Sequence, residues 1–413
     1  MKPLFYIFLS ALLVLELLVL RFQNSLNYKK SLAESNSVDV TLIKDPASSG
    51  FYQILDFGYF KATFNSADKF RVGDILRVKS FSTCNKDNIC NLYYKKAYSI
   101  DKIGEKWYAG IVRLFLDIRE KVNNLYLRNL SSPYAELLAG MTLGIKELPD
   151  KFNQDLIKTG VIHVVVVSGF NVSLVISALF PLLIFLGRRC SFFISILGVL
   201  FFVFLVGFEP PILRAAVMGL ILLYGKYEGR ERSVLAALLV TAVLMVFISP
   251  LIVLDLSFIL SFLATFGLIV FSPVVKKYVS FKLYGLEEDF VSTLSAQVLV
   301  WPIISYYFGR VSMLGPLVNI LVLWVVPLAT VLGFLYIIFA FIFEILGLEI
   351  LLFLFTAVIK IPLIYFSQVV TFFSRLPFSQ IEVQIGIGFM AFYYLFICFF
   401  LLWMIKRKSL VLQ

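Results

Sequence analysis

The chain has 413 residues, of which 60% are apolar and only 15% are charged, and its mean hydropathy is +0.91. Soluble domains carry about 25% charged residues, so this composition excludes an ordinary soluble protein and predicts a polytopic membrane protein. The apolar runs are continuous rather than alternating, which predicts membrane-spanning helices and argues against a transmembrane β-barrel. The formal net charge of +11 is expected mainly from basic loops on one side of the membrane, and the alternative is an anionic partner.

The first apolar run covers residues 4–20 and contains one charged residue, Glu16. A signal peptide is the alternative, but only Lys2 precedes the run and no small-residue cleavage site follows it. We therefore predict an uncleaved transmembrane anchor in a first segment, residues 1–27.

Residues 28–105 are polar and alternate with period two, which predicts about five short strands. The strand candidates are 38–43, 62–64, 73–79, 92–94 and a stretch around Ala97. This number of strands fits a small OB-fold-like barrel, a fold that often binds single strands of nucleic acid through basic and aromatic side chains. Lys and Arg (12) exceed Asp and Glu (9) only slightly here, so a purely structural β-domain stays open as the alternative.

Cys84 and Cys90 flank a turn-like insert inside this β-domain. If the domain is extracytoplasmic, a disulfide between them is expected, and two free thiols are the alternative. Two cysteines with no histidine nearby do not make a zinc site, so no metal is expected.

Residues 106–158 form the next segment, and its apolar residues recur with helical spacing from Trp107 to Leu125. The pattern predicts an amphipathic helix that lies on the membrane or against the helical bundle. Pro133 precedes a second predicted helix, 134–143, which Gly144 ends. We treat 106–158 as an amphipathic helical connector.

From residue 159 to 413 apolar segments follow in series and form a transmembrane helical domain. The predicted spans are 160–186, 192–208, 211–226, 233–249, 252–273, 291–308, 313–343, 349–373 and 386–405. Pro316 and Pro327 predict a broken helix in the seventh. Lys360 and Pro362 interrupt the eighth, which either spans the bilayer or lies in its interface.

The basic residues between these segments predict the orientation in the membrane. Every second loop is rich in Lys and Arg, for example at 188–189 and 406–408, whereas the intervening loops carry almost none. The positive-inside rule then places the C-terminus in the cytoplasm. With ten spans, the N-terminus is also cytoplasmic and the β-domain lies outside.

A polar cluster interrupts the apolar sequence at 160–175. It contains His163, the only histidine of the chain, with Ser168, Gly169 and Asn171. Polar residues are costly inside a membrane, so this cluster is a candidate lining of a membrane pathway.

Four further polar residues fall inside predicted spans: Arg214, Asp255, Gln297 and Asn319. Arg214 lies about one turn into its span and either faces the pathway or extends to the interface. Asp255 could pair with Arg214 or cap the following helix. For Gln297 and Asn319 taken singly, hydrogen bonding between helices is the alternative to contact with a transported molecule.

An enzyme is not expected. Ser168 and His163 are five residues apart, which is 140° around a helix, so the pair does not form a serine–histidine catalytic site. The sequence contains no nucleotide-binding loop, and no cofactor is expected.

Taken together, the motifs resemble those of the ComEC-type competence proteins, the bacterial channels for transforming DNA, over roughly residues 28–345. The residues that carry the resemblance are 137–144 (LLAGMTLG), 159–163 (TGVIH), 167–169 (VSG), 213–216 (LRAA), 255–264 (DLSFILSFLA), 295–297 (SAQ), Pro302, 308–309 (FG), Asn319 and Pro327. The resemblance implies an outer OB-like domain, a competence-type helical domain, and passage of single-stranded DNA into the cytoplasm.

Three departures from the family pattern limit what the resemblance implies. Asn171 stands where the family often has a second histidine, and Ile259 where it often has glutamine. Many members also carry a C-terminal metallo-β-lactamase-like nuclease, whereas this sequence ends at Gln413 without the histidines that such a metal centre needs.

The resulting hypothesis is a multi-pass protein of the bacterial cytoplasmic membrane that conducts single-stranded DNA without a nuclease of its own. Its expected partners are single-stranded DNA and the lipid bilayer, with a separate nuclease, a DNA receptor and a cytoplasmic translocase. The alternatives are a transporter of small solutes or ions, and a transport-inactive relic of the same fold. The sequence does not predict an oligomeric state.

Overall fold

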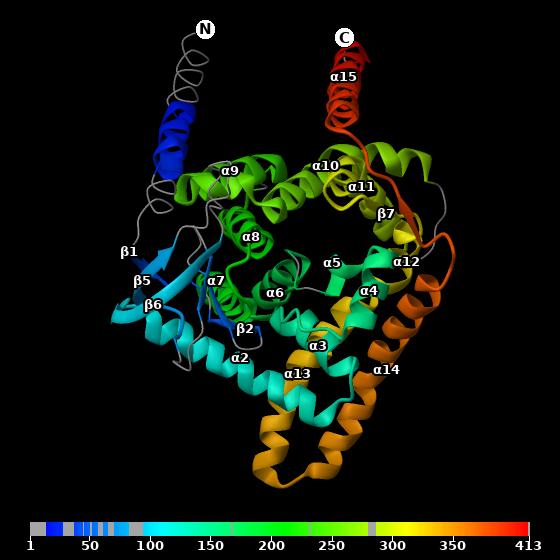
Figure 1. Ribbon diagram of the computed structural model, residues 1–413. Helices are drawn as coiled ribbons and strands as arrows, with labels where there is room; N and C mark the ends of the chain where they lie inside the picture. Colours follow the sequence, from blue (N-terminus) through cyan, green and yellow to red (C-terminus); the bar gives the residue numbers. More distant parts are fainter. Residues whose placement is uncertain are drawn as a thin grey trace. The chain divides into compact units, whose positions relative to one another are not determined.

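The computed structural model shows a mostly helical chain that has, among the residues it describes, a six-stranded sheet and a two-stranded sheet (Figure 1). It describes residues 14–27, 37–43, 45–49, 52–56, 61–64, 70–81, 94–165, 167, 169–230, 233–279 and 286–411. Cys84 and Cys90, and hence the predicted disulfide, lie outside these residues. A helix covers 14–27, within the predicted anchor segment.

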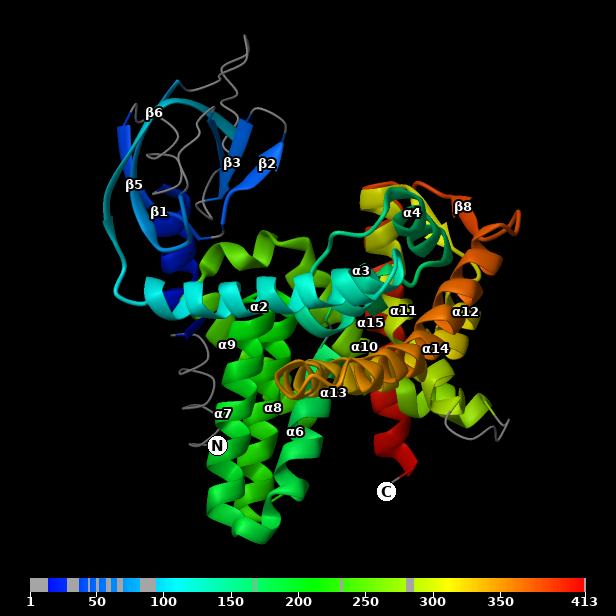
Figure 2. The same cartoon turned by 90° about the horizontal axis from the view of Figure 1, so that it is seen from below.

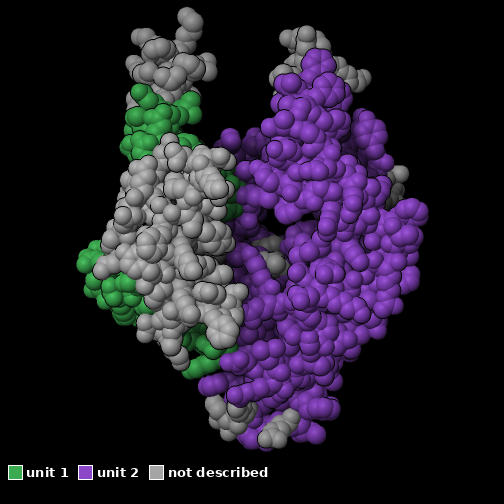
Figure 3. All heavy atoms as spheres, viewed as in Figure 1, with its two compact units in different colours: residues 1–121, 243–255 green, residues 122–242, 256–413 purple. Residues whose placement is uncertain are grey.

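The chain divides into two compact units (Figure 3). Unit 1 comprises residues 1–121 and 243–255, and unit 2 comprises 122–242 and 256–413. Both units contain separated stretches of sequence. The contiguous division predicted above, with boundaries after residues 27, 105 and 158, stays a prediction.

Unit 1 contains a six-stranded sheet (Figures 1 and 2). Its strands are β1 (Ser37–Thr41), β2 (Ala47–Ser49), β3 (Tyr52–Asp56), β4 (Lys61–Phe64), β5 (Asp74–Phe81) and β6 (Tyr94–Glu105). They are hydrogen-bonded in the order β1-β5-β6-β4-β3-β2. The β4–β6 pair is parallel, and the other pairs are antiparallel.

Alternation in β5 shows why this segment forms a strand. Leu76 and Val78 are buried in the core of the sheet, whereas Arg77 between them is exposed and pairs with Asp39 at 2.7 Å. Period-two alternation places such side chains on opposite faces of a sheet. The predicted strands 38–43, 62–64 and 73–79 match β1, β4 and β5, whereas the β2–β3 hairpin was not predicted.

The sheet is followed by α2 (Ala109–Asn129), which begins close to the turn before β5. Gly73 in that turn has φ +85°, and a Cβ atom there would lie 2.5 Å from Cβ of Ala109. Only glycine satisfies both the backbone conformation and this close approach. The predicted connector helix therefore forms, and its start is fixed against the β5 turn.

Unit 2 holds most of the helices. They are α3 (Tyr134–Leu143), α4 (Asp150–Thr159), α5 (Ile162–Val165), α6 (Gly169–Leu182), α7 (Arg188–Val206), α8 (Pro210–Glu228), most of α9 (Val234–Ile248), α10 (Leu256–Tyr278), α11 (Leu286–Phe308), α12 (Gly315–Val322), α13 (Val325–Leu346), α14 (Glu349–Ser374) and α15 (Ile387–Val411). The short strands β7 (Arg310–Ser312) and β8 (Gln380–Glu382) pair antiparallel.

Among the described residues, six helices are long and apolar enough to cross a membrane. They are Ile162–Leu182, which joins α5 and α6, Arg188–Val206, Leu256–Tyr278, Glu287–Phe308, Val325–Phe343 and Ile350–Ser374. The chain is thus a multi-pass membrane protein. Two further predicted spans form shorter apolar helices, Val234–Ile248 and Ile387–Leu401. The count of ten crossings, and the orientation that depends on it, stay predictions.

The predicted span 313–343 is interrupted, as its prolines indicated. It forms α12 and α13, with Pro316 in the first turn of α12 and Pro327 near the start of α13. Proline is tolerated in the first turn because the backbone N–H there has no partner within the helix. In contrast, Pro362 lies inside the continuous helix α14, which has the length of a membrane span.

Helices of unit 2 form a closed ring. Successive contacts join α6 to α8, α8 to α10, α10 to α11, α11 to α12, α12 to α14, α14 to α4 and α4 to α5. The chain itself then leads from α5 back to α6. These helices surround an open centre in the ribbon view (Figure 1), and the space-filling view shows the face of unit 2 hollowed there (Figure 3).

Candidate functional site

The ring carries the candidate polar residues that the sequence singled out. His163 lies on α5, Gly169 and Asn171 on α6, and Arg214 on α8, with Gln297 on α11 and Asn319 on α12. Asp255 directly precedes α10, and Ser168 lies outside the described residues. Residues separated by more than 150 positions in the sequence are therefore brought to one ring of helices.

His163 lies in the short helix α5 and is exposed, whereas its neighbours Val164 and Val165 are buried. The preceding helix α4 ends at Gly160, whose φ of +73° is the left-handed conformation common after a helix C-terminus. This turn allows the chain to change direction before α5. Within the predicted span 160–186 the structure describes α5 up to Val165 and α6 from Gly169, and both belong to the candidate membrane span Ile162–Leu182.

Gly169 is the point where α6 meets α8. A Cβ atom at Gly169 would lie 3.0 Å from Cβ of Ala215 and 3.0 Å from Nη2 of Arg214. Such distances are shorter than ordinary van der Waals contact, so a larger residue would displace the arginine side chain. Glycine here lets the start of α6 lie directly against the guanidinium of Arg214.

Arg214 joins α8 to α10. Its Nη1 donates a hydrogen bond of 3.0 Å to the backbone carbonyl of Ser261, and its Cζ lies 6.0 Å from the ring centre of Phe262. Its Nε is buried and has no hydrogen-bond acceptor among the residues that the structure describes. Arg214 is therefore a partly buried cation whose hydrogen-bonding capacity is not fully used by the described protein atoms.

Asn171 is buried, with 2% of its surface exposed. Its Nδ2 donates a hydrogen bond of 3.0 Å to the carbonyl of Met141 on α3, while its Oδ1 is buried and has no donor in the described part of the chain. The amide therefore contacts the backbone of a neighbouring helix. Whether the residue also lines a pathway stays a prediction.

Asn319 and Gln297 differ in exposure. Asn319 is 3% exposed and its Oδ1 has no donor among the described atoms, whereas Gln297 is half-buried. An amide oxygen buried in a membrane protein without a donor costs free energy unless water reaches it. The α12 side of the ring thus contains the same kind of unsatisfied atom as the α6 side.

Further buried polar atoms of unit 2 were not predicted from the sequence. Glu136 Oε2, Ser195 Oγ and Thr330 Oγ1 are also buried without a described hydrogen-bond partner. Single hydroxyl groups in apolar helices are common, so the sequence carries no signal that marks these ones. Like the unsatisfied atoms of the ring residues, these oxygens would gain hydrogen bonds from ordered water in the interior.

Glu209 directly precedes α8 and pairs with Lys146, whose Nζ lies 2.6 Å from Oε1 of Glu209. This ion pair joins the loop after α3 to the loop before α8. Asp255 is exposed and belongs to unit 1, and its predicted pairing with Arg214 or capping role stays a prediction.

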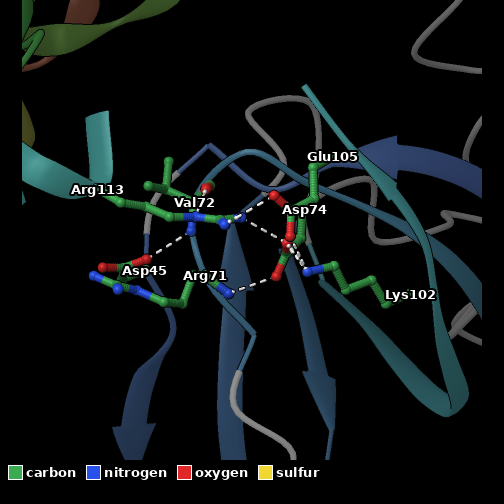
Figure 4. A network of polar contacts seen from close by, with 7 residues as sticks. All are labelled: Asp45, Arg71, Val72, Asp74, Lys102, Glu105 and Arg113. Atoms are coloured by element: carbon green, nitrogen blue, oxygen red, sulfur yellow. Dashed lines mark hydrogen bonds and ion pairs between the residues drawn. The ribbon is translucent and has the colours of Figure 1, made fainter. Parts of the chain in front are cut away.

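A second polar site, in unit 1, surrounds Asp74 at the start of β5 (Figure 4). Its carboxylate is 2% exposed and accepts hydrogen bonds from the Arg71 amide at 2.8 Å and from Nη2 of Arg113 at 2.7 Å. Nζ of Lys102 lies 2.8 Å away. This network holds β5, β6 and the first turns of α2 together.

The protonation of Asp74 reflects two opposing effects. Burial by itself raises the pKa of this carboxyl, but the hydrogen bonds from Lys102 and the Arg71 amide, with the charges of Lys102 and Arg113, more than offset it. The pKa of Asp74 is therefore lowered from its ordinary value. The carboxylate is charged at neutral pH, as the network requires.

The part of the chain that the structure describes contains no cluster of three or more His, Cys, Asp or Glu side chains that could hold a metal ion. The described cysteines, Cys190 and Cys398, are free and exposed.

Comparisons with known proteins agree with the motif pattern. The family model described as "Competence protein" matches residues 141–408. A protein of Bacillus subtilis (strain 168), ComE operon protein 3, is 32% identical over 167 residues, which are 40% of this chain and 21% of that protein. An uncharacterized protein of Aquifex aeolicus (strain VF5) is 35% identical over 147 residues, 35% of this chain and 34% of that protein.

The matched regions thus cover only about a fifth and a third of these two relatives. No solved structure matches the chain.

Proposed function

Because the chain belongs to the competence protein family, we propose that it serves DNA uptake as a channel that passes a single DNA strand across the bacterial cytoplasmic membrane. The observation that carries this proposal is the closed ring of helices in unit 2 and the hollow at its centre (Figures 1 and 3). A ring of packed helices can enclose a hydrated path while its outer surface remains apolar toward lipid.

The polar groups of the ring support a hydrated path. Arg214 Nε, Asn171 Oδ1 and Asn319 Oδ1 are buried without described partners on three different helices. In a dry apolar interior each such atom would cost on the order of 1–3 kcal/mol, so water near these positions is the simpler explanation. Polar and charged residues inside membranes typically mark substrate pathways.

Arg214 is the residue that we assign to contact with DNA. Its guanidinium forms one bond to the Ser261 carbonyl and retains unused donors. A guanidinium group binds phosphate oxygens through paired donors, and each nucleotide of a DNA strand carries one phosphate. Conduction requires binding that is weak enough for the transported molecule to leave. A single cation of this kind would attract the strand without trapping it.

The sheet of unit 1 supports a second element of the proposal, an OB-like barrel. β1 and β2 are separated by only five residues and lie at opposite ends of the strand order. If β1 and β2 are counted as two halves of one bent strand, the sheet has five strands. The bent strand then forms both edges of the sheet, which is what closure into a barrel requires. We assign this domain to the outer side of the membrane, with both chain ends in the cytoplasm, where it would receive single-stranded DNA.

The proposal assigns no catalytic step to this chain. Degradation of the second strand, capture of DNA at the cell surface and the driving force for transport would come from a separate nuclease, a DNA receptor and a translocase. Because the chain matches only part of its relatives, these assignments stay proposals.

The test is uptake of end-labelled DNA into the cytoplasm of cells with and without this protein. We expect cells lacking it to bind DNA at their surface normally but to contain no labelled strand in the cytoplasm, and restored protein to restore uptake. Equal uptake in both strains would refute the proposal. Flux of a small solute through proteoliposomes, without an effect on DNA, would instead support a solute transporter.

A further inference from the structure

The helices α6, α7 and α8 lie side by side and share one end (Figure 2). Exposed cations are found in the residues at this end. We call this cluster the basic end; its members are Arg188, Arg189, Lys226 and Arg230. Residues 182–193 contain no acidic residue, and Glu228 is the only one in 224–230. The basic end therefore carries a net positive charge.

One member of the basic end is held in place by backbone. Nη2 of Arg188, in the first turn of α7, donates a hydrogen bond of 2.6 Å to the carbonyl of Lys226 in the last turn of α8. A cation at a helix C-terminus satisfies carbonyl groups that have no partner within the helix. The two basic segments are thus joined before any ligand binds, which lowers the entropic cost of binding.

Exposed apolar side chains flank the basic end. Leu182 at the end of α6 is 67% exposed, Phe185 in the following turn is 77% exposed, and Phe193 on α7 is 61% exposed. Large apolar groups of this exposure are expected to contact lipid tails, because water would not favour so much apolar surface in one place. The same end of the bundle therefore offers positive charge next to an apolar rim.

The position of the basic end at the start of a candidate membrane span indicates its depth in the membrane. The candidate span Arg188–Val206 begins with Arg188 and Arg189 themselves. Residues at the end of a membrane span lie at the level of the lipid headgroups, where phosphate groups are found. This conclusion holds for either orientation of the protein.

We propose that the basic end is a binding site for anionic phospholipid, with headgroup phosphates on Arg188, Arg189 and Lys226 and acyl chains on the apolar rim. Basic pockets between transmembrane helices bind such headgroups. The apolar rim favours a lipid over DNA or an acidic protein, since neither of these would cover Leu182 and Phe185. This proposal is independent of the DNA path proposed above.

The test measures how the full-length purified chain in detergent is stabilised against heat by added cardiolipin, compared with phosphatidylcholine. We expect cardiolipin to stabilise the wild-type chain and phosphatidylcholine not to. Since each Lys or Arg near an anionic surface contributes a factor of about five in affinity, Arg189→Gln should raise the half-saturating cardiolipin concentration about five-fold. Arg188→Gln combined with Arg189→Gln should raise it about thirty-fold.

The matched control removes the same charge at another helix end. Lys276 and Lys277 are adjacent, exposed and in the last turn of α10, and Lys276 lies 4.0 Å from Glu288. Changing both to Gln should shift the half-saturating concentration less than two-fold, because the acidic first turn of α11 (Glu287, Glu288 and Asp289) offsets their charge. The single variant Arg189→Gln serves as a control for misfolding, because it leaves the hydrogen bond from Arg188 to the Lys226 carbonyl intact.

Two outcomes would overturn the proposal. If the α7 variants and the α10 control shift the cardiolipin response equally, only the overall charge matters and the basic end is not a site. If the α7 variants instead lose binding of a single-stranded oligonucleotide and keep the cardiolipin response, the basic end binds DNA and not phospholipid.

Discussion

Replacement of Arg214 by methionine should leave the protein folded but stop DNA uptake. Methionine has a similar length and no charge. The change removes the hydrogen bond from Nη1 to the Ser261 carbonyl, and a bond of this charged type contributes about 1.5–3 kcal/mol. It also removes a cation from within the membrane, which relieves a cost of about 2.5–3.5 kcal/mol.

These two terms nearly cancel, so we expect the free energy of unfolding to change by less than about 1.5 kcal/mol. A residue that serves only the fold would not behave this way, because its removal would destabilise the protein. A residue kept for function is often neutral or costly for stability. Unchanged stability with lost uptake would therefore mark Arg214 as part of the DNA path.

The assay combines thermal unfolding of the purified variant with uptake of labelled DNA in cells that contain wild-type amounts of it. Arg310→Met is the matched control, since Arg310 is exposed in β7 and should be dispensable for uptake. Normal uptake by the Arg214→Met variant would refute the assigned role. Loss of the folded protein would show that the residue is structural instead.

Three further predictions concern the fold. Asp74→Asn should weaken the β5–β6–α2 network by about 2–3 kcal/mol, since it leaves Arg113 without its buried carboxylate, and hydrogen exchange of β5 and β6 should become faster. Because the pKa of Asp74 is lowered in the folded protein, the wild-type protein should exceed this variant in free energy of unfolding by the full amount near pH 6, and the difference should shrink as the pH falls below about 4. A difference in the free energy of unfolding that persists at pH 2 would contradict this. Gly333→Val should prevent close packing of α13 on α3, because a Cβ atom there would lie 2.6 Å from Cγ2 of Thr142. The amount of folded protein in membranes should therefore fall severely. Gly388→Ala should be tolerated, because a Cβ atom at Gly388 would lie in open space.

The sequence predicted the kind of fold well where a local signal exists. The long apolar runs indicated membrane helices, and Gly144 marked the end of α3. The prolines indicated the break between α12 and α13. Each of these signals acts through the backbone conformation of a few neighbouring residues, and tertiary contacts do not override it.

Where the signal is long-range, the sequence was less informative. The pairing of α6 with α8 through Gly169 and Arg214 joins segments about 45 residues apart, and hydropathy does not mark such a contact. The ring of helices was not predicted, because apolar helices carry no mark of which neighbour they pack against.

The candidate site shows the same limit. The apolar sequence around Asn171 indicated a polar residue inside the membrane, but not that its amide would donate a hydrogen bond to the Met141 carbonyl thirty residues away. Likewise, the strand at 73–79 was predicted, whereas the partners of Asp74 on β6 and α2 were not. Hydrogen bonds between distant segments depend on the assembled fold.

The most direct test of the DNA path places a photo-crosslinking amino acid at His163 on the ring and irradiates cells during DNA uptake. Phe353 on α14, 69% exposed, serves as the control position on an apolar surface. With both substituted proteins active in uptake, we predict that the crosslinker at position 163 captures labelled single-stranded DNA and the one at position 353 does not. Active uptake without capture at position 163, or equal capture at both positions, would contradict a DNA path through the ring.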